Sequence, residues 1–284
     1  MKILVTGASG QLGSDLVKEL NQRGHGVCCP DSRELDITDP EAVQTVLTAL
    51  HPDAVMHCAA YTAVDNAEDD RERCNLVNVT GTEHIARVCA EIGAKLLYIS
   101  TDYVFPGTGE TPWEPDDATA PLNVYGMSKL RGEEAVRKFV PEHFIVRISW
   151  LFGLHGKNFV KTMLRLGAER EKLTVVCDQI GSPTYTVDLA RLLADMIMTD
   201  RYGTYHATNE GFCSWYEFAC AIMEKAGLPA KVEPVTSAEY AAKAARPFNS
   251  RMSKRKLTEN GFARLPDWQD ALERYLKELE NETK

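Results

Sequence analysis

The stretch KILVTGASGQLG, from Lys2 to Gly13, joins a short apolar run to three glycines spaced G-x-x-G-x-x-G. The apolar run predicts a buried strand over Ile3–Thr6, and the residues after it predict a helix over Leu12–Arg23. Glycines between a strand and a helix let a pyrophosphate approach the backbone at the positive end of the helix. The stretch therefore predicts a dinucleotide site, with a purely structural turn as the alternative. The predicted contacts are Gly7, Gly10, Gln11, Leu12 and Gly13.

The alternation of strand and helix continues through the first half of the chain. Strands that are almost continuously apolar and alternate with helices predict a parallel sheet with helices on both faces. We therefore expect an α/β fold, a Rossmann-like doubly wound parallel sheet. Its further strands are predicted over Val27–Pro30, Ala54–His57, Lys95–Ser100 and Phe144–Ile148, and its helices over Pro40–Leu50, Val79–Ile92 and Tyr125–Phe139.

The pattern becomes looser after Trp150, with shorter predicted elements and a final helix over Pro266–Glu280. We found no repeat or linker that separates this part from the first half. We expect a dinucleotide-binding domain over residues 1–150 and a smaller substrate lobe over residues 151–284, interleaved with the sheet. The stretch Phe105–Asn123 is irregular and rich in Pro, Gly and Asp, so it is expected to line or cover a site.

A second decisive pattern is Tyr125-Gly126-Met127-Ser128-Lys129, which places a Tyr and a Lys on one face of a predicted helix. A free tyrosine titrates near pH ~10, and a neighbouring ammonium lowers its pKa. The pair can then exchange a proton with a carbonyl or hydroxyl oxygen. Alone, this spacing is typical of many ordinary solvated helices. The Tyr-Lys spacing indicates catalysis only in combination with the glycine stretch and the residues at the end of the fourth strand.

The fourth predicted strand ends in Ser100-Thr101-Asp102-Tyr103, at the edge where parallel α/β sheets bind ligands. A hydroxyl of Thr101 or Ser100 could donate a hydrogen bond to a substrate carbonyl, or the two could merely cap the strand. Together the patterns predict three catalytic residues: Thr101, Tyr125 and Lys129. Thr101 would steady an oxyanion, Tyr125 would deliver a proton, and Lys129 would lower the Tyr125 pKa and hold a nicotinamide ribose.

Residues after the second strand give conflicting signals about the cofactor. Asp31 stands where an acid would bond the adenosine ribose and select NAD, whereas Arg33 could meet the 2′-phosphate of NADP. We therefore expect both NADH and NADPH to be used. The small residues at the end of the third strand could let the cofactor cross the strand ends, or they could allow a helix to pack closely on the sheet. The further predicted cofactor contacts are Asp36, Ile37, Ala59, Ala60, Tyr61, Thr62, Tyr125 and Lys129.

Over nearly its full length the chain resembles the extended short-chain dehydrogenase/reductase family, and within it the dTDP-4-dehydrorhamnose reductases. The resemblance implies an NAD(P)H-dependent oxidoreductase that reduces the 4-keto group of a dTDP-linked 6-deoxy sugar. The implied reaction converts dTDP-4-dehydro-L-rhamnose to dTDP-L-rhamnose, a cell-wall sugar donor. It also implies that Trp150 contacts the substrate. The segments that carry the resemblance are Thr6–Gly13, Cys58–Asp65, Ser100–Phe105, Pro121–Lys129, Arg147–Gly153, Asp178–Thr184 and Ala245–Asn249.

Two alternative functions stay open. The first is an epimerase or dehydratase that acts on a related sugar nucleotide. Sugar-nucleotide 4,6-dehydratases, which the chain resembles in fold, have Asp and then Glu after the Thr, and Tyr103 stands at the Glu position. A phenol replaces a carboxylate base poorly, so elimination is disfavoured, and Asp102 is expected to bind substrate or order its loop. The second alternative is a non-catalytic regulatory subunit of the same fold, and the intact catalytic set argues against it.

Polar residues of the second half are the expected substrate contacts. Asn158 opens a predicted helix, where an anion could bind. Arg246 lies beside a rigid turn and could hold a pyrophosphate, or it could form a surface salt bridge. Some relatives dimerise through magnesium held by glutamates, and the shorter Asp15 and Asp188 stand at the matching positions. We therefore expect no metal requirement, and a monomer or homodimer.

Composition limits the remaining possibilities. The net charge of -9 over 284 residues argues against a nucleic-acid-binding surface. Eight cysteines are scattered without C-x-x-C or zinc-site spacing, which is typical of a reducing cytoplasm. The first predicted strand follows the first residue, so we expect no signal peptide. No apolar run reaches the ~20 residues of a membrane span.

Overall fold

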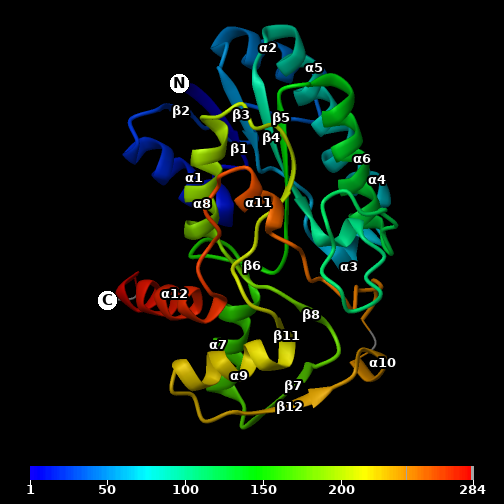
Figure 1. Cartoon of the computed structure of the whole chain (residues 1–284), viewed down its shortest axis with the longest axis vertical. Coiled ribbons are helices and arrows are strands. Elements are labelled where there is room, and N and C mark those ends of the chain that lie inside the picture. Colours follow the sequence, from blue (N-terminus) through cyan, green and yellow to red (C-terminus); the bar gives the residue numbers. More distant parts are fainter. Residues whose placement is uncertain (241, 283–284) are drawn as a thin grey trace.

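A six-stranded parallel sheet forms the centre of the protein in a computed structural model that describes residues 1–240 and 242–282 (Figure 1). Residues 241, 283 and 284 of the predicted second segment lie outside the described residues. The strand order is β10-β5-β4-β3-β1-β2, and every neighbouring pair is parallel. The predicted Rossmann-like sheet is therefore confirmed. Its strands are β1 (Lys2–Thr6), β2 (Gly26–Cys28), β3 (Ala54–His57), β4 (Lys95–Thr101), β5 (His143–Ile148) and β10 (Gly203–His206).

Helices cover both faces of this sheet, so its strands are buried on both sides (Figure 1). One face packs against α1 (Gln11–Gln22), α8 (Thr186–Ile197) and α11 (Arg255–Glu259). The opposite face packs against α2 (Pro40–Leu50), α5 (Thr82–Ile92) and α6 (Val124–Phe139). Two separate apolar cores result, which explains why the strands are almost continuously apolar in sequence.

Short polar residues fix where the helices of the sheet begin. Asp39 caps α2 by accepting hydrogen bonds from the Glu41 and Ala42 amides, as predicted from the sequence. Asn123 caps α6 by accepting from the Gly126 amide at 2.7 Å. Because α6 begins at this cap, Tyr125 is held in its first turn, next to the end of β4.

The region before α5 differs from the single predicted helix over Val79–Ile92. The helical path begins earlier and contains one wide turn, because the side chain of Asn78 bonds outside the helix and Gly81 adds flexibility. Such a wide turn leaves no periodic signal in the sequence. The elements are α3 (Val64–Ala67), α4 (Arg71–Asn75), the π-helix η1 (Leu76–Gly81) and α5. The expected irregular stretch Phe105–Asn123 follows a 3-10 turn, η2 (Asp102–Val104).

The second half of the chain builds a smaller lobe below the carboxyl ends of the strands, but it also contributes β10 and α8 to the sheet (Figure 1). Three two-stranded sheets and three long helices enclose a separate apolar core. The boundary at residue 150 stays a prediction. The lobe contains β6 (Leu151–Phe152), α7 (Phe159–Glu169), β7 (Lys172–Val176), β8 (Ile180–Gly181), β9 (Thr184–Tyr185), β11 (Cys213–Ser214), α9 (Trp215–Lys225), β12 (Lys231–Val235), α10 (Ser237–Tyr240) and α12 (Trp268–Glu282).

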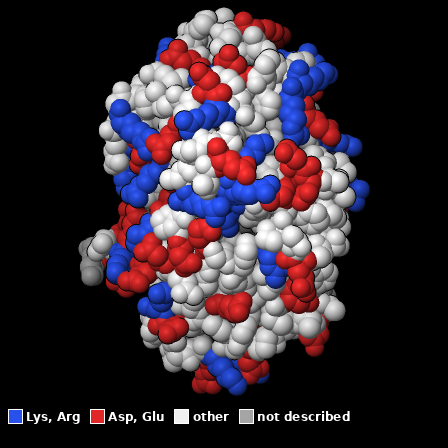
Figure 2. All heavy atoms as spheres, viewed as in Figure 1, with Lys and Arg blue, Asp and Glu red and all other residues white. Residues whose placement is uncertain are grey.

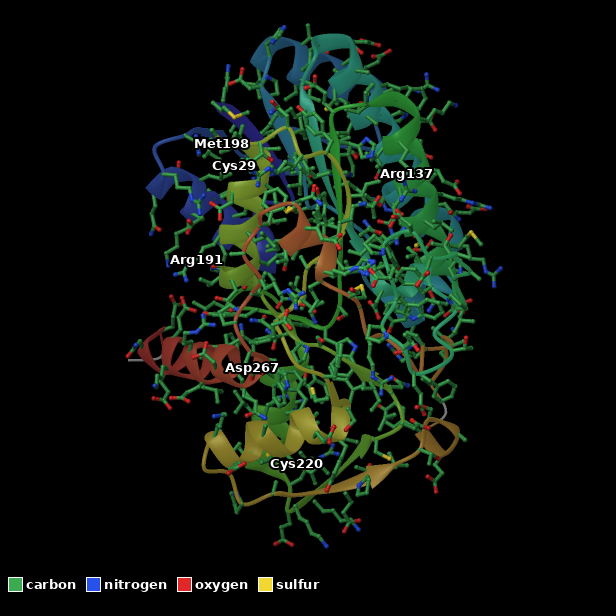
Figure 3. All side chains as sticks on the ribbon, in the orientation of Figure 1. Cys29, Arg137, Arg191, Met198, Cys220 and Asp267 are labelled. Carbon is green, nitrogen blue, oxygen red and sulfur yellow. The ribbon has the colours of Figure 1, made fainter. Side chains whose placement is uncertain are left out.

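Charged side chains of both signs are mixed over the visible face, with Lys and Arg gathered near its middle, over α11 (Figure 2). The run at residues 254–256 belongs to this group. Lys254 is buried with its ammonium over the Phe212 ring, and Arg255 pairs with Glu114 and Glu259. Cysteines stay scattered, with Cys29 beside β2 and Cys220 on α9 (Figure 3). Among the described residues, none of the helices has the length and apolar character needed to span a bilayer.

Candidate active site

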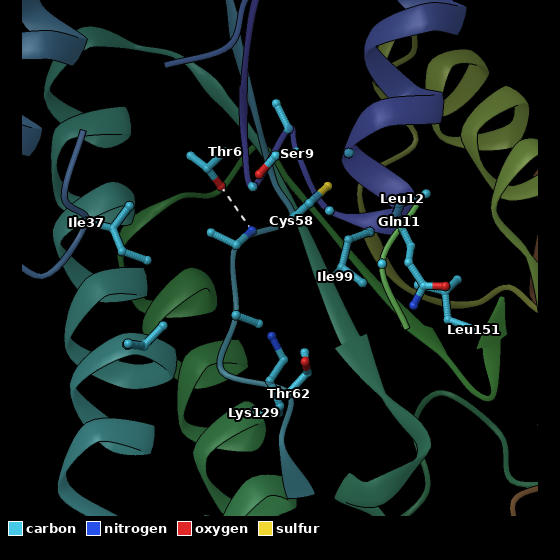
Figure 4. A pocket seen from close by; sticks show the side chains of 18 of the residues that line it. Thr6, Ser9, Gln11, Leu12, Ile37, Cys58, Thr62, Ile99, Lys129 and Leu151 are labelled. Atoms are coloured by element: carbon cyan, nitrogen blue, oxygen red, sulfur yellow. Dashed lines mark hydrogen bonds between the residues drawn. The ribbon is translucent and has the colours of Figure 1, made fainter. Parts of the chain in front are cut away.

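A pocket of about 940 Å³ lies at the carboxyl ends of the sheet strands (Figure 4). Because β2 and β3 flank opposite sides of β1, the chain changes winding direction there, which is where doubly wound sheets bind ligands. Most of the predicted site residues meet in this one pocket. Its wall includes Gly7, Gly10, Gln11, Leu12, Gly13, Asp31, Asp36, Ile37, Ala59, Ala60, Thr62, Thr101, Asp102, Tyr125, Lys129 and Trp150.

The glycine loop between β1 and α1 brings the backbone close to the edge of β3. Gly7 has a φ of 66°, and a Cβ there would lie 2.7 Å from the Ala59 amide nitrogen. Thr6 also accepts a hydrogen bond from that amide at 3.2 Å (Figure 4). Among the described residues no side chain caps α1, whose N-cap is Gly10. The first amides of α1 are therefore available to an anion, and the loop fits a pyrophosphate.

At the far end of the pocket lies Asp31, one of the two residues that gave conflicting cofactor signals. The Arg33 guanidinium donates to the Asp31 carboxylate at 2.7 and 3.2 Å. This contact lowers the pKa of Asp31. The Arg33 side chain is 90% exposed and does not line the pocket, whereas Asp31 does. In this structure, the Asp31 carboxylate and the Arg33 guanidinium, which would discriminate between NAD and NADP, are therefore bonded to each other.

The inner end of the pocket holds the predicted catalytic tyrosine. Thr101 lies near enough to the Tyr125 hydroxyl to lower its pKa, and the Tyr103 ring meets the Tyr125 ring edge-on at 5.7 Å. Glycine at position 126 allows this approach, because a Cβ there would collide with the Tyr103 carbonyl oxygen. The Ser100 hydroxyl, the other predicted donor, is committed to Glu133 at 2.6 Å. Of the two predicted hydroxyls, that of Thr101 is therefore the one that lies beside Tyr125.

The Tyr125 pKa is raised in this structure, not lowered as the sequence predicted. Burial raises it well above its usual value and the Asp102 carboxylate raises it further, against a smaller lowering by Thr101. The Lys129 ammonium lies 4.0 Å from the centre of the Tyr98 ring, and burial lowers the pKa of Lys129 to about 7. Burial of the phenol therefore outweighs the groups that favour the phenolate, and a lowering of the Tyr125 pKa by Lys129 stays a prediction.

A buried amide joins the catalytic helix to the edge of β3. Asn78 is 1% exposed, and its Nδ2 donates to the Ser128 hydroxyl at 2.9 Å and to the Tyr61 carbonyl at 3.0 Å. Its Oδ1 accepts from the Tyr61 amide at 2.8 Å. Ser128 in turn donates to the Tyr125 carbonyl at 2.7 Å. Tyr61 does not line the pocket. Its backbone, bonded to Asn78, anchors the loop that follows β3.

Asp102 is almost fully enclosed at the pocket wall, with 2% exposure. Thr101 donates to its Oδ1 at 3.0 Å, and Ser250 donates to its Oδ2 at 2.5 Å. Burial raises the pKa of Asp102 to about 6, while these hydrogen bonds act in the opposite direction. Ser250 comes from the segment before α11, so the carboxyl is held between the sheet and the C-terminal part of the chain.

Two predicted substrate residues differ in their position. Trp150 lines the pocket with a left-handed backbone, φ 50°, and its ring stacks on Trp215 at 3.8 Å. Asn158 lies outside the wall and caps α7. Its amide also donates to Gln11 Oε1 at 3.0 Å and the Gly153 carbonyl at 2.8 Å. Because both amide hydrogens of Asn158 already bond to protein, this side chain holds the lobe against the glycine loop, and its contact with substrate stays a prediction.

The predicted substrate contact Arg246 also lies behind the pocket wall. Its guanidinium pairs with Asp65 at 2.6 Å and donates to the Tyr103 hydroxyl at 3.2 Å. The salt bridge that the sequence left open is thus present. Because Tyr103 lines the pocket, Arg246 supports the wall, and its contact with substrate stays a prediction.

Comparison with known proteins identifies the chain's relatives. A family model described as "RmlD substrate binding domain" matches residues 1–281. The chain is 42% identical to dTDP-4-dehydrorhamnose reductase of Escherichia coli K12, over 98% of both chains. It is 43% identical to the spore coat polysaccharide biosynthesis protein SpsK of Bacillus subtilis, over 98% of this chain and 97% of that one. The chain belongs to the dTDP-4-dehydrorhamnose reductase family.

A solved structure of this reductase family agrees with the fold. The Bacillus anthracis dTDP-4-dehydrorhamnose reductase, solved in complex with NADP, superimposes with a TM-score of 0.95 at 46% identity. The match covers 98% of this chain and 99% of that chain. The family assignment makes the protein an oxidoreductase and confirms the resemblance seen in the sequence.

The two aspartates at the positions expected to hold magnesium have different surroundings. Arg274 donates to both oxygens of Asp188, at 2.8 and 2.7 Å, and Asn209 donates to Oδ2 at 2.9 Å. Burial raises the pKa of Asp15, whose Oδ2 has no hydrogen-bond partner among the described residues. In residues 1–240 and 242–282, no group of three or more His, Cys, Asp or Glu side chains could hold a metal. Metal independence stays a prediction.

Sequence reasoning missed several residues of the reductase pocket. Arg73, from α4, lies near enough to Asp36 to lower its pKa. Gly156 and Lys157 reach the glycine loop from the segment before α7, and a Cβ at 156 would lie 3.3 Å from the Gln11 Cγ. These residues come from segments far from the glycine and Tyr-Lys patterns, so the local sequence carried no signal for them.

Proposed function

We propose that this protein reduces the 4-keto group of a dTDP-linked 6-deoxy sugar, converting dTDP-4-dehydro-L-rhamnose to dTDP-L-rhamnose with NADPH or NADH. The observation that carries the proposal is the meeting of Thr101, Tyr125 and Lys129 at one end of a pocket that begins at the glycine loop. The named relatives and the NADP-bound neighbour support the same reaction.

The residues fit a dinucleotide along the pocket. The uncapped amides of α1 would hold the pyrophosphate, and Asp31 lies where the adenosine ribose is expected. Lys129 would hold the nicotinamide ribose at the other end, where anionic phosphates of the ligands favour its charged form. When bound, the reduced nicotinamide supplies the hydride for the carbonyl carbon.

The protein's own side chains handle the carbonyl oxygen. Tyr125 donates its phenolic proton to the oxygen as negative charge develops there. Its raised pKa keeps the phenol protonated before the reaction. Thr101, which lies beside that phenol, donates to the same oxygen and stabilises the developing charge. The half-buried Trp150 edge offers an apolar surface for the sugar or base.

The epimerase or dehydratase alternative is disfavoured by the surroundings of Tyr103. Burial and the Asp102 carboxylate raise the pKa of Tyr103, and its hydroxyl is bonded to Arg246. A phenol that keeps its proton cannot remove a proton from carbon as a carboxylate would. The regulatory-subunit alternative does not explain why a proton donor and a hydroxyl donor converge at the end of the pocket.

The test is a turnover assay with a panel of nucleotide-linked 4-keto sugars. We expect steady consumption of NADPH and of NADH with dTDP-4-dehydro-L-rhamnose, and NMR of the product should show the L-rhamno configuration. Epimerised or dehydrated product without net cofactor consumption would assign the protein to the first alternative. Cofactor binding without consumption for every sugar of the panel would favour the second.

The assembly and location of the protein belong to this proposal as well. We propose a monomer or homodimer and a cytoplasmic enzyme, because its dTDP-sugar substrate is a soluble metabolite and the cysteines are unpaired. Light scattering of the purified protein and fractionation of the source cells would measure these two properties.

A further inference from the structure

The Thr101 hydroxyl has one hydrogen to donate, and in this structure it is already in use. A hydroxyl carries a single donor and two acceptor sites. Thr101 donates to Asp102 Oδ1 at 3.0 Å and accepts from the Tyr103 amide at 3.2 Å. While this bond lasts, Thr101 cannot also donate to a carbonyl oxygen in the pocket. The role of Thr101 in the proposed reaction therefore depends on what Asp102 does.

Few changes at Asp102 could release the Thr101 hydrogen that it accepts. The carboxyl is 2% exposed, and its second oxygen accepts from Ser250 at 2.5 Å. The titratable groups that face it are phenols: Tyr103 beside it in the chain and Tyr125 on α6. The other groups that affect its charge are Thr101, Ser250 and the backbone amides of Asp102 and Tyr103. These contributors include no cation, so proton uptake is the simplest change open to the carboxyl.

We propose that Asp102 is a positioning residue that decides the direction in which Thr101 donates its hydrogen. When Asp102 is ionised, it accepts the Thr101 hydrogen and withdraws it from the substrate. When Asp102 carries a proton on Oδ1, that proton is donated to the Thr101 oxygen, and the Thr101 hydrogen turns to the substrate oxygen. No covalent bond changes in this step other than the protonation of the carboxyl from solvent through the pocket. The proposal rests on the proposed function.

The arrangement predicts how activity depends on pH. Burial raises the pKa of Asp102 to about 6, so the productive direction is favoured below that pH and lost above it. The anionic phosphates of both ligands would raise this pKa further, because nearby negative charge opposes ionisation. Removing the Ser250 hydrogen bond should also raise it, since that bond stabilises the carboxylate.

The experiment measures kcat/KM against pH for the holoenzyme and four variants, with NADPH saturating and dTDP-4-dehydro-L-rhamnose varied. In the unmodified protein, kcat/KM should decline as pH rises through the Asp102 pKa. Ser250→Ala should move this decline to higher pH. Asp102→Asn should abolish it, because an amide does not titrate. Thr101→Val should lower the rate and also abolish this decline, because Asp102 acts through Thr101.

Ser253→Ala is the matched control. Ser253 lies three residues from Ser250, its amide bonds the Trp113 carbonyl, and its hydroxyl accepts from the Arg255 amide. This variant should keep the profile of the unmodified protein. Lys129 also titrates, with a pKa near 7, and its separate decline at higher pH should remain in Asp102→Asn and should not move in Ser250→Ala. The decline that Asp102→Asn abolishes is the one at the Asp102 pKa.

A merely structural role for Ser250 would lower thermal stability without moving the decline to higher pH. The proposal is overturned if Ser250→Ala leaves the decline in place or moves it to lower pH, or if Asp102→Asn keeps it. If Ser250→Ala does not fold, the Asp102→Asn profile decides alone. Absence of turnover in the unmodified protein would contradict the proposed function, whereas turnover with an unchanged Asp102→Asn profile would contradict only this inference.

Discussion

The two walls of the pocket use their polar groups in opposite ways. On the sheet side, the glycine loop leaves the first amides of α1 uncapped, and Thr101 and Tyr125 line the pocket. On the side of the smaller lobe, the polar residues singled out in the sequence, Asn158 and Arg246, are bonded to other protein groups. The sheet side leaves backbone amides uncapped for a ligand, whereas the side-chain donors on the lobe side bond to other protein groups and hold the lobe in place.

The difference shows which kinds of site a sequence reveals. The glycines act through the backbone of one continuous loop, so their spacing contains the whole signal. Asn158 bonds Gln11 across 147 residues of chain, and Arg246 bonds Asp65 across 181. No local pattern tells whether such a side chain faces a ligand or another segment. On the sheet side the predicted residues line the pocket, whereas on the lobe side polar type alone did not show that Asn158 and Arg246 bond to other segments.

The strongest test of the sheet wall is Tyr125→Phe. We expect kcat to fall by roughly a thousandfold, because general acid catalysis contributes about 10²–10⁴. The KM for NADPH should change little. Steady-state kinetics would measure both, and Tyr103→Phe is the matched control because its ring contacts Tyr125 but its hydroxyl bonds Arg246. Undiminished turnover of Tyr125→Phe would remove this residue from the mechanism.

Lys129→Met should lower kcat/KM by about 10²-fold, since the ammonium both holds the ribose and favours proton transfer. Its buried amine has a pKa lowered to about 7 without ligands, so the charged form is present below that pH and lost above it. The variant should also melt at a higher temperature near neutral pH, because it removes a group whose charged form is favoured when unfolded. Kinetics with thermal denaturation tests both effects. A lower melting temperature would mean that the Tyr98 contact outweighs the cost of burial.

The strand-helix alternation predicted the sheet well because each strand is apolar on both faces, and each loop carries its own cap or glycine. The helix Pro40–Leu50 and the strand Ala54–His57 match the prediction to the residue. The wide turn η1 was not predicted, because Asn78 makes its decisive bonds to Tyr61 and Ser128, which lie elsewhere in the chain.

Electrostatics was the least predictable property of the site. The spacing of Tyr125 and Lys129 indicated correctly that both reach the pocket, but not where the ammonium points. The Lys129 ammonium lies over the ring of Tyr98, a residue in the middle of β4. Ser250 was absent from the predicted site for a similar reason: its partner Asp102 is 148 residues away. Contacts between residues so far apart in the sequence can be identified only when the fold is known.

Asn158→Ala tests the lobe wall. Loss of the α7 cap and of buried hydrogen bonds should lower the free energy of unfolding by about 2 kcal/mol, as measured by urea denaturation. The KM for the dTDP-sugar should stay within about threefold. Thr162→Ala is the control, because its hydroxyl bonds the Asn158 carbonyl in the same turn without reaching the glycine loop. A large rise in KM without loss of stability would restore Asn158 as a substrate contact.

The smallest effect is expected at the exposed pair Asp31 and Arg33. Arg33→Ser should weaken NADPH relative to NADH by only about fivefold, because a solvent-exposed ion pair contributes little to binding. Asp31→Asn should shift the preference the opposite way, since it frees the guanidinium and removes the acceptor for a ribose hydroxyl. Catalytic efficiencies with both cofactors at two salt concentrations would measure this, and added salt should reduce the difference. A thousandfold preference in the unmodified protein would mean that another residue of the pocket wall, such as Arg73, rather than this pair, reads the cofactor.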